Sequence, residues 1–441
     1  MIDPVVTDLP LSLVNVTPAC VGLVPLKNGR LMLAWGDPYA GVLKAIDSGD
    51  DGRTWSSPRE LKLADGTTFA SRGVPCLLRL ASGRLGLVHR QSDQATHRYP
   101  MHVRQTYHYH VSDDEGQTWS PGVVVNTQGG REFAMMDALI QLSTGRLVMP
   151  MALVCGPAVT RPDPSNTPRF GERFGNVWAY CTMFCRCYYS DDEGRTWRPS
   201  ANEVHATIEG GVGGGYSMDE PFVAELADGR LLMMANTTLG RLFRSYSEDG
   251  GETWHEAEAT DLVQRRSPLL VRRVPGSDDV LVLWNQLSPW EGMNALFRHR
   301  LSSAISSDGG KTWKHFQNLE SLDDTAKLTP DSDRVEFTFI GPGARQPLDR
   351  ARYHRAPGPL RMDHPSCRFH EGKAYICYGV GQLGDAEIIE QTYGRNYDEV
   401  GEKLGFSKTP IHGKPGSIRS KWWLGFNRFR VLPVEWFYRG V

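Results

Sequence analysis

The stretch SGDDGRTW, from Ser48 to Trp55, decides the fold of this chain because closely related stretches recur along it. Five copies satisfy the pattern S-x-D-x-G-x-T-W without a mismatch, and they begin at Ser48, Ser112, Ser190, Ser247 and Ser306. The Asp can accept hydrogen bonds from nearby backbone N–H groups, and the Gly tolerates a left-handed backbone. Each copy therefore predicts a turn between two antiparallel strands, with the Trp packed between neighbouring units.

A second pattern completes each repeat unit. An apolar strand, a Gly-Arg-Leu-type turn and another apolar strand precede the motif, as in PFVAELADGRLLMMAN from Pro221. The motif tryptophans lie 64, 78, 57 and 59 positions apart, a long period that with several short strands per unit is typical of a β-propeller. A sixth unit from Pro365 lacks the motif, so an all-β propeller of six four-stranded antiparallel blades is predicted, with Val5–Val16 completing the ring.

The bulk properties favour one large domain over residues 1–441. Apolar residues make up 40% of the chain, which is ample for a core, and the net charge is only −2, with acidic and basic residues interspersed. This balance gives no indication of nucleic acid or an anionic membrane surface as a partner. No apolar run approaches the roughly 20 residues of a spanning helix, and Met1-Ile2-Asp3-Pro4 begins no signal peptide, which favours a cytoplasmic location.

Cysteine spacing does not predict a metal site. Cys181, Cys185 and Cys187 form a C-x3-C-x-C cluster, but the alternation in YCTMFCRCYY indicates a strand and no His stands at ligand spacing. Buried thiols behave as small apolar groups, so we expect reduced, structural cysteines. Neither a metal nor a cofactor is expected.

Charged residues mark the predicted ligand site. In a propeller the first strands of all blades meet at the axis, so residues at their starts should surround a central site. These residues include Arg72, Asp137, Asp219, Glu220, Arg266 and His364, and those at the ends of the second strands include His89, Arg90, Asn236 and Trp284. Charged groups are almost never buried unpaired, so they either bind a ligand or pair with one another as structural plugs.

The repeated motif is identified as the Asp-box of the sialidase (neuraminidase) superfamily, which the chain resembles over nearly its whole length. The resemblance implies a glycoside hydrolase that takes a terminal acidic sugar, sialic acid or a relative. That family holds the substrate carboxylate with three Arg, protonates the leaving group with an Asp, and attacks with a Tyr activated by a Glu. The implied partner is an anionic carbohydrate bound at the centre of the ring.

Part of the catalytic set can be carried over onto this sequence. Arg72, in Arg72-Gly73-Val74-Pro75, resembles the first Arg, and Asp93 is the nearest match to the acid. Glu220 opens the segment EPFVAELADGRLL and so resembles the activating Glu. Arg298, eight residues before Ser306, holds the place of the third Arg.

Two positions depart from the family pattern. Asn236 stands where the second Arg is expected, and Asp363-His364-Pro365 stands where the Tyr nucleophile is expected. These departures keep two alternatives to the hydrolase open. One is a polysaccharide lyase, or another His-dependent enzyme, acting on a uronate-containing glycan through His89 or His364, with Arg72 or Arg90 neutralising the uronate. The other is a glycan-binding propeller without catalysis, whose affinity would come from Trp35, Trp284 and Trp290.

Overall fold

The computed structural model describes most of the chain. The described residues are 4–9, 21–37, 40–71, 73–91, 105–129, 132–155, 182–207, 215–216, 218–237, 239–264, 267–287, 298, 300–321, 360–382 and 425–440. Within these ranges no helix has the length and apolar character needed to cross a membrane.

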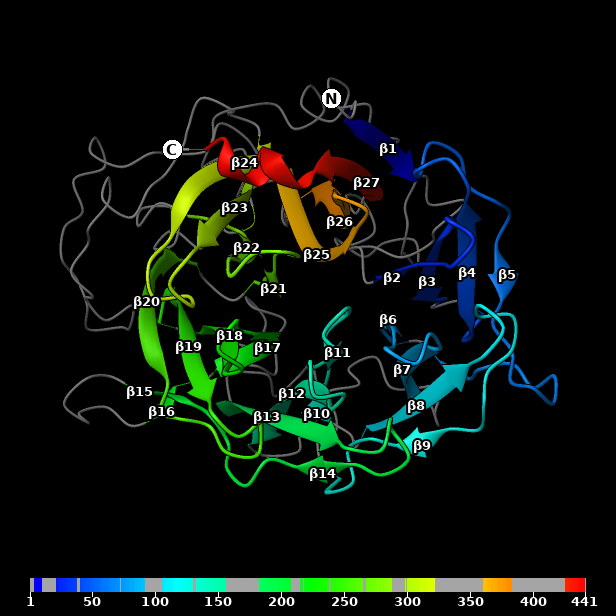
Figure 1. Ribbon diagram of the computed structural model, residues 1–441, viewed down its shortest axis with the longest axis horizontal. Coiled ribbons are helices and arrows are strands. Elements are labelled where there is room, and N and C mark those ends of the chain that lie inside the picture. The colour runs from blue at the N-terminus through cyan, green and yellow to red at the C-terminus, as the bar shows by residue number, and fades with distance from the viewer. Residues whose placement is uncertain are drawn as a thin grey trace, which may run out of the picture.

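Six antiparallel sheets stand as blades around one axis, as predicted (Figure 1). Blade one contains β2 (Val21–Pro25), β3 (Leu31–Gly36), β4 (Leu43–Ser48) and β5 (Arg59–Glu60). Blade two contains β6 (Cys76–Arg79), β7 (Leu85–Gln91), β8 (Thr106–Ser112) and β9 (Val123–Val124). In blade three the inner position is shared by β10 (Glu132–Phe133) and β11 (Ile140–Gln141), followed by β12 (Leu147–Cys155), β13 (Thr182–Ser190) and β14 (Arg198–Pro199).

The second half of the ring repeats this order. Blade four contains β17 (Met218–Glu225), β18 (Leu231–Thr237), β19 (Arg241–Ser247) and β20 (Glu258–Val263). Blade five contains β21 (Leu270–Arg273), β22 (Val280–Trp284), β23 (Arg300–Ser306) and β24 (Lys314–Ser321). Blade six contains β25 (Leu360–His370), β26 (Lys373–Gln382), β27 (Gly425–Pro433) and β1 (Val5–Leu9). A two-stranded ribbon, β15 (Ala206–Thr207) with β16 (Gly215–Tyr216), precedes blade four, and a 3-10 helix, η4 (Val434–Tyr438), follows β27.

The N-terminal strand closes the ring. β1 pairs antiparallel with β27, from Val5 opposite Val431 to Leu9 opposite Asn427, and so forms the outer strand of blade six. The prediction that the N-terminal stretch completes the ring is confirmed for residues 5–9, and the rest of that stretch lies outside the described residues. The first and last blade strands of the chain therefore share one sheet.

Each Asp-box forms the same hydrogen-bonded turn. In blade one the Thr54 N–H donates to Asp50 Oδ1 at 2.8 Å, the Thr54 hydroxyl donates to Asp50 Oδ2 at 2.6 Å, and the Gly52 N–H donates to Ser48 Oγ at 2.8 Å. Equivalent bonds are present in the boxes that begin at Ser112, Ser190, Ser247 and Ser306. The predicted role of the Asp as an acceptor of backbone N–H groups is confirmed.

The boxes also pack the blades together. The Trp55 ring lies 5.1 Å from Phe429 of blade six, and the Trp197 ring lies 5.5 Å from Tyr109 of blade two, both edge to face. In each case the aromatic side chain of one box contacts the preceding blade, as predicted. The largest apolar cluster accordingly contains residues from blades two to six, so the core runs between the blades around the ring.

The boxes lie at the opposite end of the blades from the predicted site. In blade four, Ser247 at the start of the box pairs with Leu231 at the start of β18. Asn236 lies near the other end of β18, where it pairs with Asp219. We call the end that holds Asp219 and Asn236 the site end of the propeller.

Candidate functional site

A buried ion cluster closes the axis. Asp137 is fully buried, forms an ion pair of 3.0 Å with Arg272 and a second one with Arg368, and accepts the Cys367 N–H at 3.0 Å. Arg368 also donates to the carbonyls of Leu23 and Leu77. This cluster joins the inner parts of five of the six blades. Asp137, which was predicted in the ligand ring, is therefore a structural plug, the alternative that the sequence left open.

Blades four and six carry matched distortions on the site side of this plug. The β17–β18 register shifts between Asp219 and Phe222, and the β25–β26 register shifts between Asp363 and Ser366. The residues at the two bulges, Glu220 and His364, have left-handed backbones with φ of 52° and 51°. Each directly precedes a proline, and each side chain is partly exposed.

Such a backbone is unfavourable for residues other than glycine, and bulges are over-represented next to active sites because they re-aim a side chain. The two matched bulges on inner strands therefore make Glu220 and His364 candidate site residues.

Hydrogen bonds orient Glu220. The Asn236 Nδ2 group donates to Glu220 Oε2 at 2.7 Å, and the Glu220 N–H donates to Asp219 Oδ1 at 2.7 Å. Asn236 and Asp219 are buried cross-strand partners, so both are fixed by the sheet. The structure thus brings three predicted residues together in blade four. Asn236 takes the place of the expected Arg and holds the carboxylate of Glu220.

Two residues of blade five hydrogen-bond to the backbone of blade six beside its bulge. The Met362 N–H donates to the Arg298 carbonyl at 2.7 Å, and the Asn285 Nδ2 group donates to the carbonyls of Met362 and Arg300, each at 3.0 Å. Arg298 is only 9% exposed and has a left-handed backbone with φ of 71°. The backbone of Arg298 is therefore hydrogen-bonded to Met362, two residues before His364.

Blade two supplies a second cation at the site end. Arg90 is half-buried, its carbonyl accepts the Ser71 hydroxyl at 2.8 Å, and its guanidinium donates to Gln105 Oε1 at 3.4 Å. A Cβ on Gly73 would lie 2.7 Å from Arg90 Cβ, so the backbone on either side of Arg72 passes close to Arg90. Arg72 itself, like Asp93 and Arg266, lies outside the described residues.

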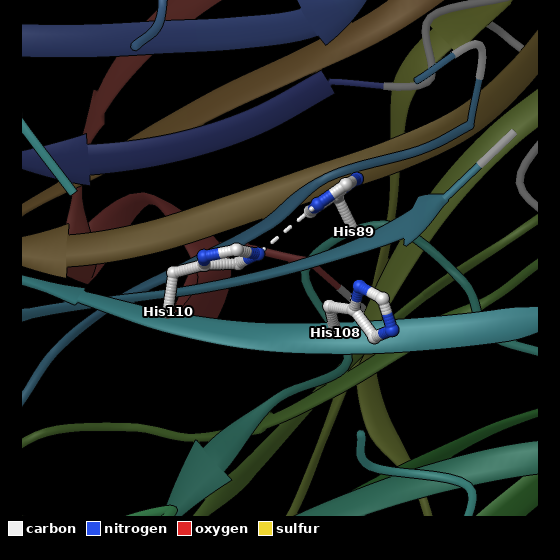
Figure 2. A group of neighbouring side chains, drawn as sticks. All are labelled: His89, His108 and His110. Atoms are coloured by element: carbon white, nitrogen blue, oxygen red, sulfur yellow. Dashed lines mark hydrogen bonds between the residues drawn. The ribbon is translucent and has the colours of Figure 1, made fainter. Parts of the chain in front are cut away.

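Three other predicted site residues are buried in the blades. Trp284 is fully buried, and its ring packs edge to face on Phe316, 5.9 Å away, so it is a core residue and not a surface for a sugar ring. Trp35 is likewise buried. His89 is 2% exposed, lies against His110 (Figure 2) and packs edge to face on Phe69. The structure therefore favours His364 over His89 for contact with a substrate.

A polar network in blade three was missed at the sequence level. Glu132 is fully buried, accepts the Tyr188 hydroxyl at 2.8 Å and Asn126 Nδ2 at 3.1 Å, and pairs with Arg186 at 3.2 Å. Burial, with the neighbouring Glu132 carboxylate, raises the pKa of Tyr188 above its usual value. Glu132 lies on a two-residue strand without periodic apolar neighbours, so no pattern distinguished it from a loop residue.

Comparisons with known proteins agree with this architecture. The family described as BNR repeat-like domain matches residues 65–339. A solved protein of unknown function from Dyadobacter fermentans has a TM-score of 0.54 at 15% identity, covering 98% of both chains. The NanB sialidase of Streptococcus pneumoniae has a TM-score of 0.51 at 10% identity, covering 95% of this chain and 68% of that one. At these identities the likeness shows the fold alone.

A curated relative matches a shorter segment. The vacuolar protein sorting/targeting protein 10 of Aspergillus clavatus is 26% identical over 149 residues, which is 34% of this chain. The match spans only 8% of the length of that relative.

Proposed function

This chain belongs to the BNR repeat-like family, whose six-bladed propeller it shares with sialidases, and on this basis we propose that it is a glycoside hydrolase. Its proposed substrate is a glycan ending in an acidic sugar, sialic acid or a relative. The observation that carries the proposal is the pair of matched bulges, which hold Glu220 and His364 on the inner strands of blades four and six.

The residues at the site end suit such a reaction. The transition state of glycoside hydrolysis resembles an oxocarbenium ion, and the Glu220 carboxylate, fixed by Asn236, would stabilise its positive charge. His364 stands where the resemblance implied a Tyr, and an imidazole can take a proton from an attacking water near neutral pH. Arg298 would bind the sugar carboxylate. The roles of Arg72 as a further cation and of Asp93 as the acid rest on the sequence resemblance.

The proposal is tested by the mass of the products after incubation with sialylated and uronate-containing oligosaccharides. We expect cleavage of a terminal acidic sugar with the mass of one water added. Cleavage without added water would contradict a hydrolase. A panel that remains intact, but is bound, would contradict an enzyme and support a binding module.

Site variants test the residues separately from the reaction class. General acid–base groups and fixed charges that stabilise a transition state each typically contribute at least ~100-fold. We therefore expect His364→Gln and Glu220→Gln each to lower kcat by about that factor. Matched controls lie at the opposite end of blade six: His370→Gln on β25 and Glu371→Gln in the following turn should keep the activity. Full activity in Glu220→Gln and His364→Gln would exclude these residues from the chemistry.

The second candidate function is a lyase acting on a uronate-containing glycan. It is favoured by one observation, that a His and not a Tyr stands at the bulge of blade six. The Arg298 carbonyl accepts the Met362 N–H two residues before this His. A lyase needs a cation to neutralise the uronate carboxylate and a base to remove the adjacent proton. Its product would carry a carbon–carbon double bond conjugated with the carboxylate, which ultraviolet absorbance detects directly.

A further inference from the structure

Three histidines share one face of blade two. His89 on β7 pairs with His108 on β8, and His110 pairs with Leu87 on the same two strands. Because side chains alternate along a strand, residues 108 and 110 point to one face, and the cross-strand partner His89 points to it as well. Figure 2 shows the three imidazoles grouped on that face.

The spacing of their ring nitrogens fits a metal ion. His89 Nε2 and His110 Nε2 are 3.2 Å apart, and donor nitrogens of all three rings lie within 4.8 Å of one another. With Zn–N bonds of about 2.0–2.1 Å and tetrahedral angles, neighbouring ligand nitrogens are about 3.3 Å apart. His89 and His110 already have this separation. His108 is half-buried, and its donor nitrogen belongs to the same group, so it supplies the third ligand of the set.

The backbone fixes the tautomer of His110. His110 Nδ1 lies 2.8 Å from the Ser120 carbonyl oxygen, which can only accept a hydrogen bond, so Nδ1 carries the proton. The lone pair of Nε2 is therefore directed at His89. A ring N–H bonded to a carbonyl, with the other nitrogen free to coordinate, is the usual outer support of a metal-binding histidine.

The surroundings keep both imidazoles neutral. The Phe69 ring packs edge to face on His89 at 5.1 Å and on His110 at 4.8 Å, and both histidines are buried. Burial beside an aromatic ring disfavours a charged imidazolium, so it favours the neutral ring. Neutral imidazole is the form that binds metals.

A hydrogen bond between the two rings accounts for only part of this arrangement. In that case His89 Nε2–H donates to His110 Nε2, which satisfies both atoms. His89 Nδ1 then remains buried with no hydrogen-bond partner among the described residues.

We propose that His89, His108 and His110 form a binding site for a divalent transition metal, with Zn²⁺ as the expected ion. Imidazole donors suit zinc, and a three-histidine set leaves the fourth tetrahedral position for water. The ion would hold β7 and β8 together beside Phe69. Two residues after Phe69, Ser71 donates to the Arg90 carbonyl, so the site would also steady the backbone that flanks Arg72. The proposal does not depend on the reaction proposed above.

Metal binding is tested on the full-length protein, stripped of metal with a chelator and then loaded with Zn²⁺. We expect about one zinc ion per chain after dialysis, and visible absorption bands of a tetrahedral site when Co²⁺ replaces Zn²⁺. Loss of a group that merely supports a ligand costs metal sites about 10–100-fold in affinity, so loss of a ligand in His108→Gln should weaken binding at least ~100-fold in chelator competition. His205→Gln, at an exposed histidine of blade three, is the matched control.

Stability gives a second readout. Zn²⁺ should raise the melting temperature of the wild type and of His205→Gln, but not that of His108→Gln, because an ion that binds only the folded state stabilises it. Circular dichroism would establish that His108→Gln folds, which its half-buried position leads us to expect. Failure of the wild type to retain zinc, or equal zinc affinity in His108→Gln and the wild type, would overturn the proposal.

Discussion

Asp137 shows how one buried charge can hold a ring of blades together. Its carboxylate pairs with Arg272 of blade five and Arg368 of blade six, and Arg368 continues to the carbonyls of blades one and two. Each charged group of this cluster therefore forms an ion pair or a hydrogen bond with a residue of another blade. The cluster fills the axis with paired charges, and Glu220 and His364 lie on inner strands at the site end beyond it.

Replacing this carboxylate should be costly. Asp137→Asn keeps the size of the side chain but leaves two largely buried guanidiniums without a counter-charge, and breaking a buried ion pair costs about 3–5 kcal/mol. We expect the free energy of unfolding, measured in urea, to fall by that amount. Asp113→Asn is the control, because that side chain is 80% exposed and lies 4.0 Å from Arg84. An equal, small effect of both substitutions would contradict a stabilising plug.

The sequence predicted the place of such residues but not their roles. Position within the repeat put Asp137, Glu220 and His364 at the inner positions of their blades, and the structure agrees. Whether a charge faces a ligand or another blade depends on side chains from distant units, here Arg272 and Arg368. Nothing in the Asp137 segment indicates those partners. The His cluster escaped prediction for a similar reason, since it depends on the pairing of β7 with β8.

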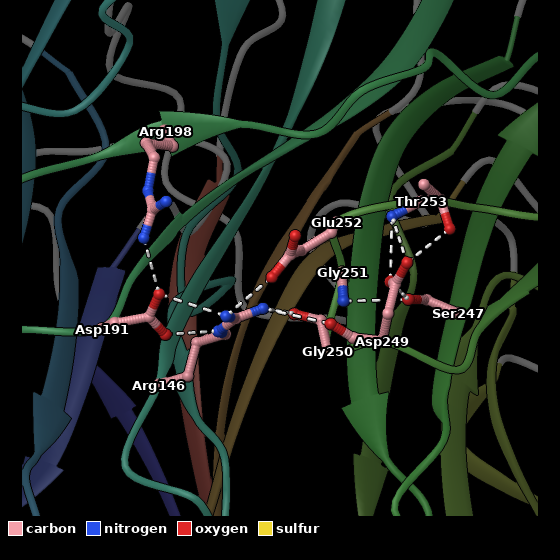
Figure 3. A network of polar contacts seen from close by, with 9 residues as sticks. All are labelled: Arg146, Asp191, Arg198, Ser247, Asp249, Gly250, Gly251, Glu252 and Thr253. Carbon is pink, nitrogen blue, oxygen red and sulfur yellow. Dashed lines mark hydrogen bonds and ion pairs between the residues drawn. The ribbon is translucent and has the colours of Figure 1, made fainter.

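The Asp-box is the element whose structure follows most directly from its sequence. Its hydrogen bonds are local, between residues at most four positions apart, so the motif alone determines the turn. Figure 3 shows the box of blade four, where Asp249 accepts bonds from Thr253 and Ser247. Arg146 of blade three reaches the same box, donating to Glu252 and to the carbonyl of Gly250. The box therefore also links neighbouring blades.

The bulges at Glu220 and His364 are the opposite case. Both segments have the apolar pattern of a regular strand followed by a Gly turn, and nothing in that pattern predicts a left-handed residue. The distortion becomes visible only from the register against β18 and β26.

Gly194 in the box of blade three should be far less tolerant of substitution than a turn glycine with open space around it. Gly194 has φ of 88°, and a Cβ there would overlap the ring of Tyr109 in blade two. Gly145, in a turn of the same blade, has φ of 92° but no atom within 4 Å of such a Cβ. Backbone strain is common to both, so Gly194→Ala should lower the free energy of unfolding by about 1–3 kcal/mol more than Gly145→Ala. Equal losses would show that the box does not press against blade two.

The box carboxylates predict a loss of stability in acid. Hydrogen bonds from Thr54, through its hydroxyl and its backbone N–H, lower the pKa of Asp50 to about 2. In the other boxes burial alone would raise the pKa, but the bonds from the following Thr outweigh it, so the pKa of Asp114, Asp192, Asp249 and Asp308 is also lowered. A folded pKa below the unfolded one contributes stability that is present above the unfolded value and is lost as the pH falls through the folded value.

The window for this loss runs from about pH 4, near the unfolded pKa of Asp, down to about pH 2. We expect the urea midpoint of unfolding to be steady from about pH 7 to about pH 5 and to fall progressively below about pH 4. Asp192→Asn should lower the midpoint at neutral pH and reduce its dependence on pH in the acid window. A midpoint as pH-dependent in Asp192→Asn as in the wild type would count against the contribution of the box.

Across the whole molecule, ring closure depends on residues from both ends of the described chain. The outer strand β1 is added to blade six by pairing with β27, and Asp8 on β1 forms an ion pair of 2.7 Å with Arg428. Arg428 also pairs with Glu320 of blade five at 2.7 Å. Strand β1 thus seals the edge of blade six and connects it, through Arg428, to the preceding blade.

The buried face of β1 should therefore stabilise the entire propeller. Val5 and Leu9 pack in the apolar cluster between blades one and six, whereas Val6 on the same strand is 51% exposed. Replacing buried aliphatic side chains by Ala costs about 2–5 kcal/mol for a Leu, because the contacts are lost and a cavity remains. The Val5→Ala/Leu9→Ala double variant should lose at least that much free energy of unfolding, while Val6→Ala should stay within about 0.5 kcal/mol of the wild type. Urea unfolding followed by tryptophan fluorescence measures the difference, because box tryptophans lie at blade interfaces around the ring. If the double variant were as stable as Val6→Ala, blade six would be closed without β1, and the ring would owe its integrity to the axial plug and the boxes alone.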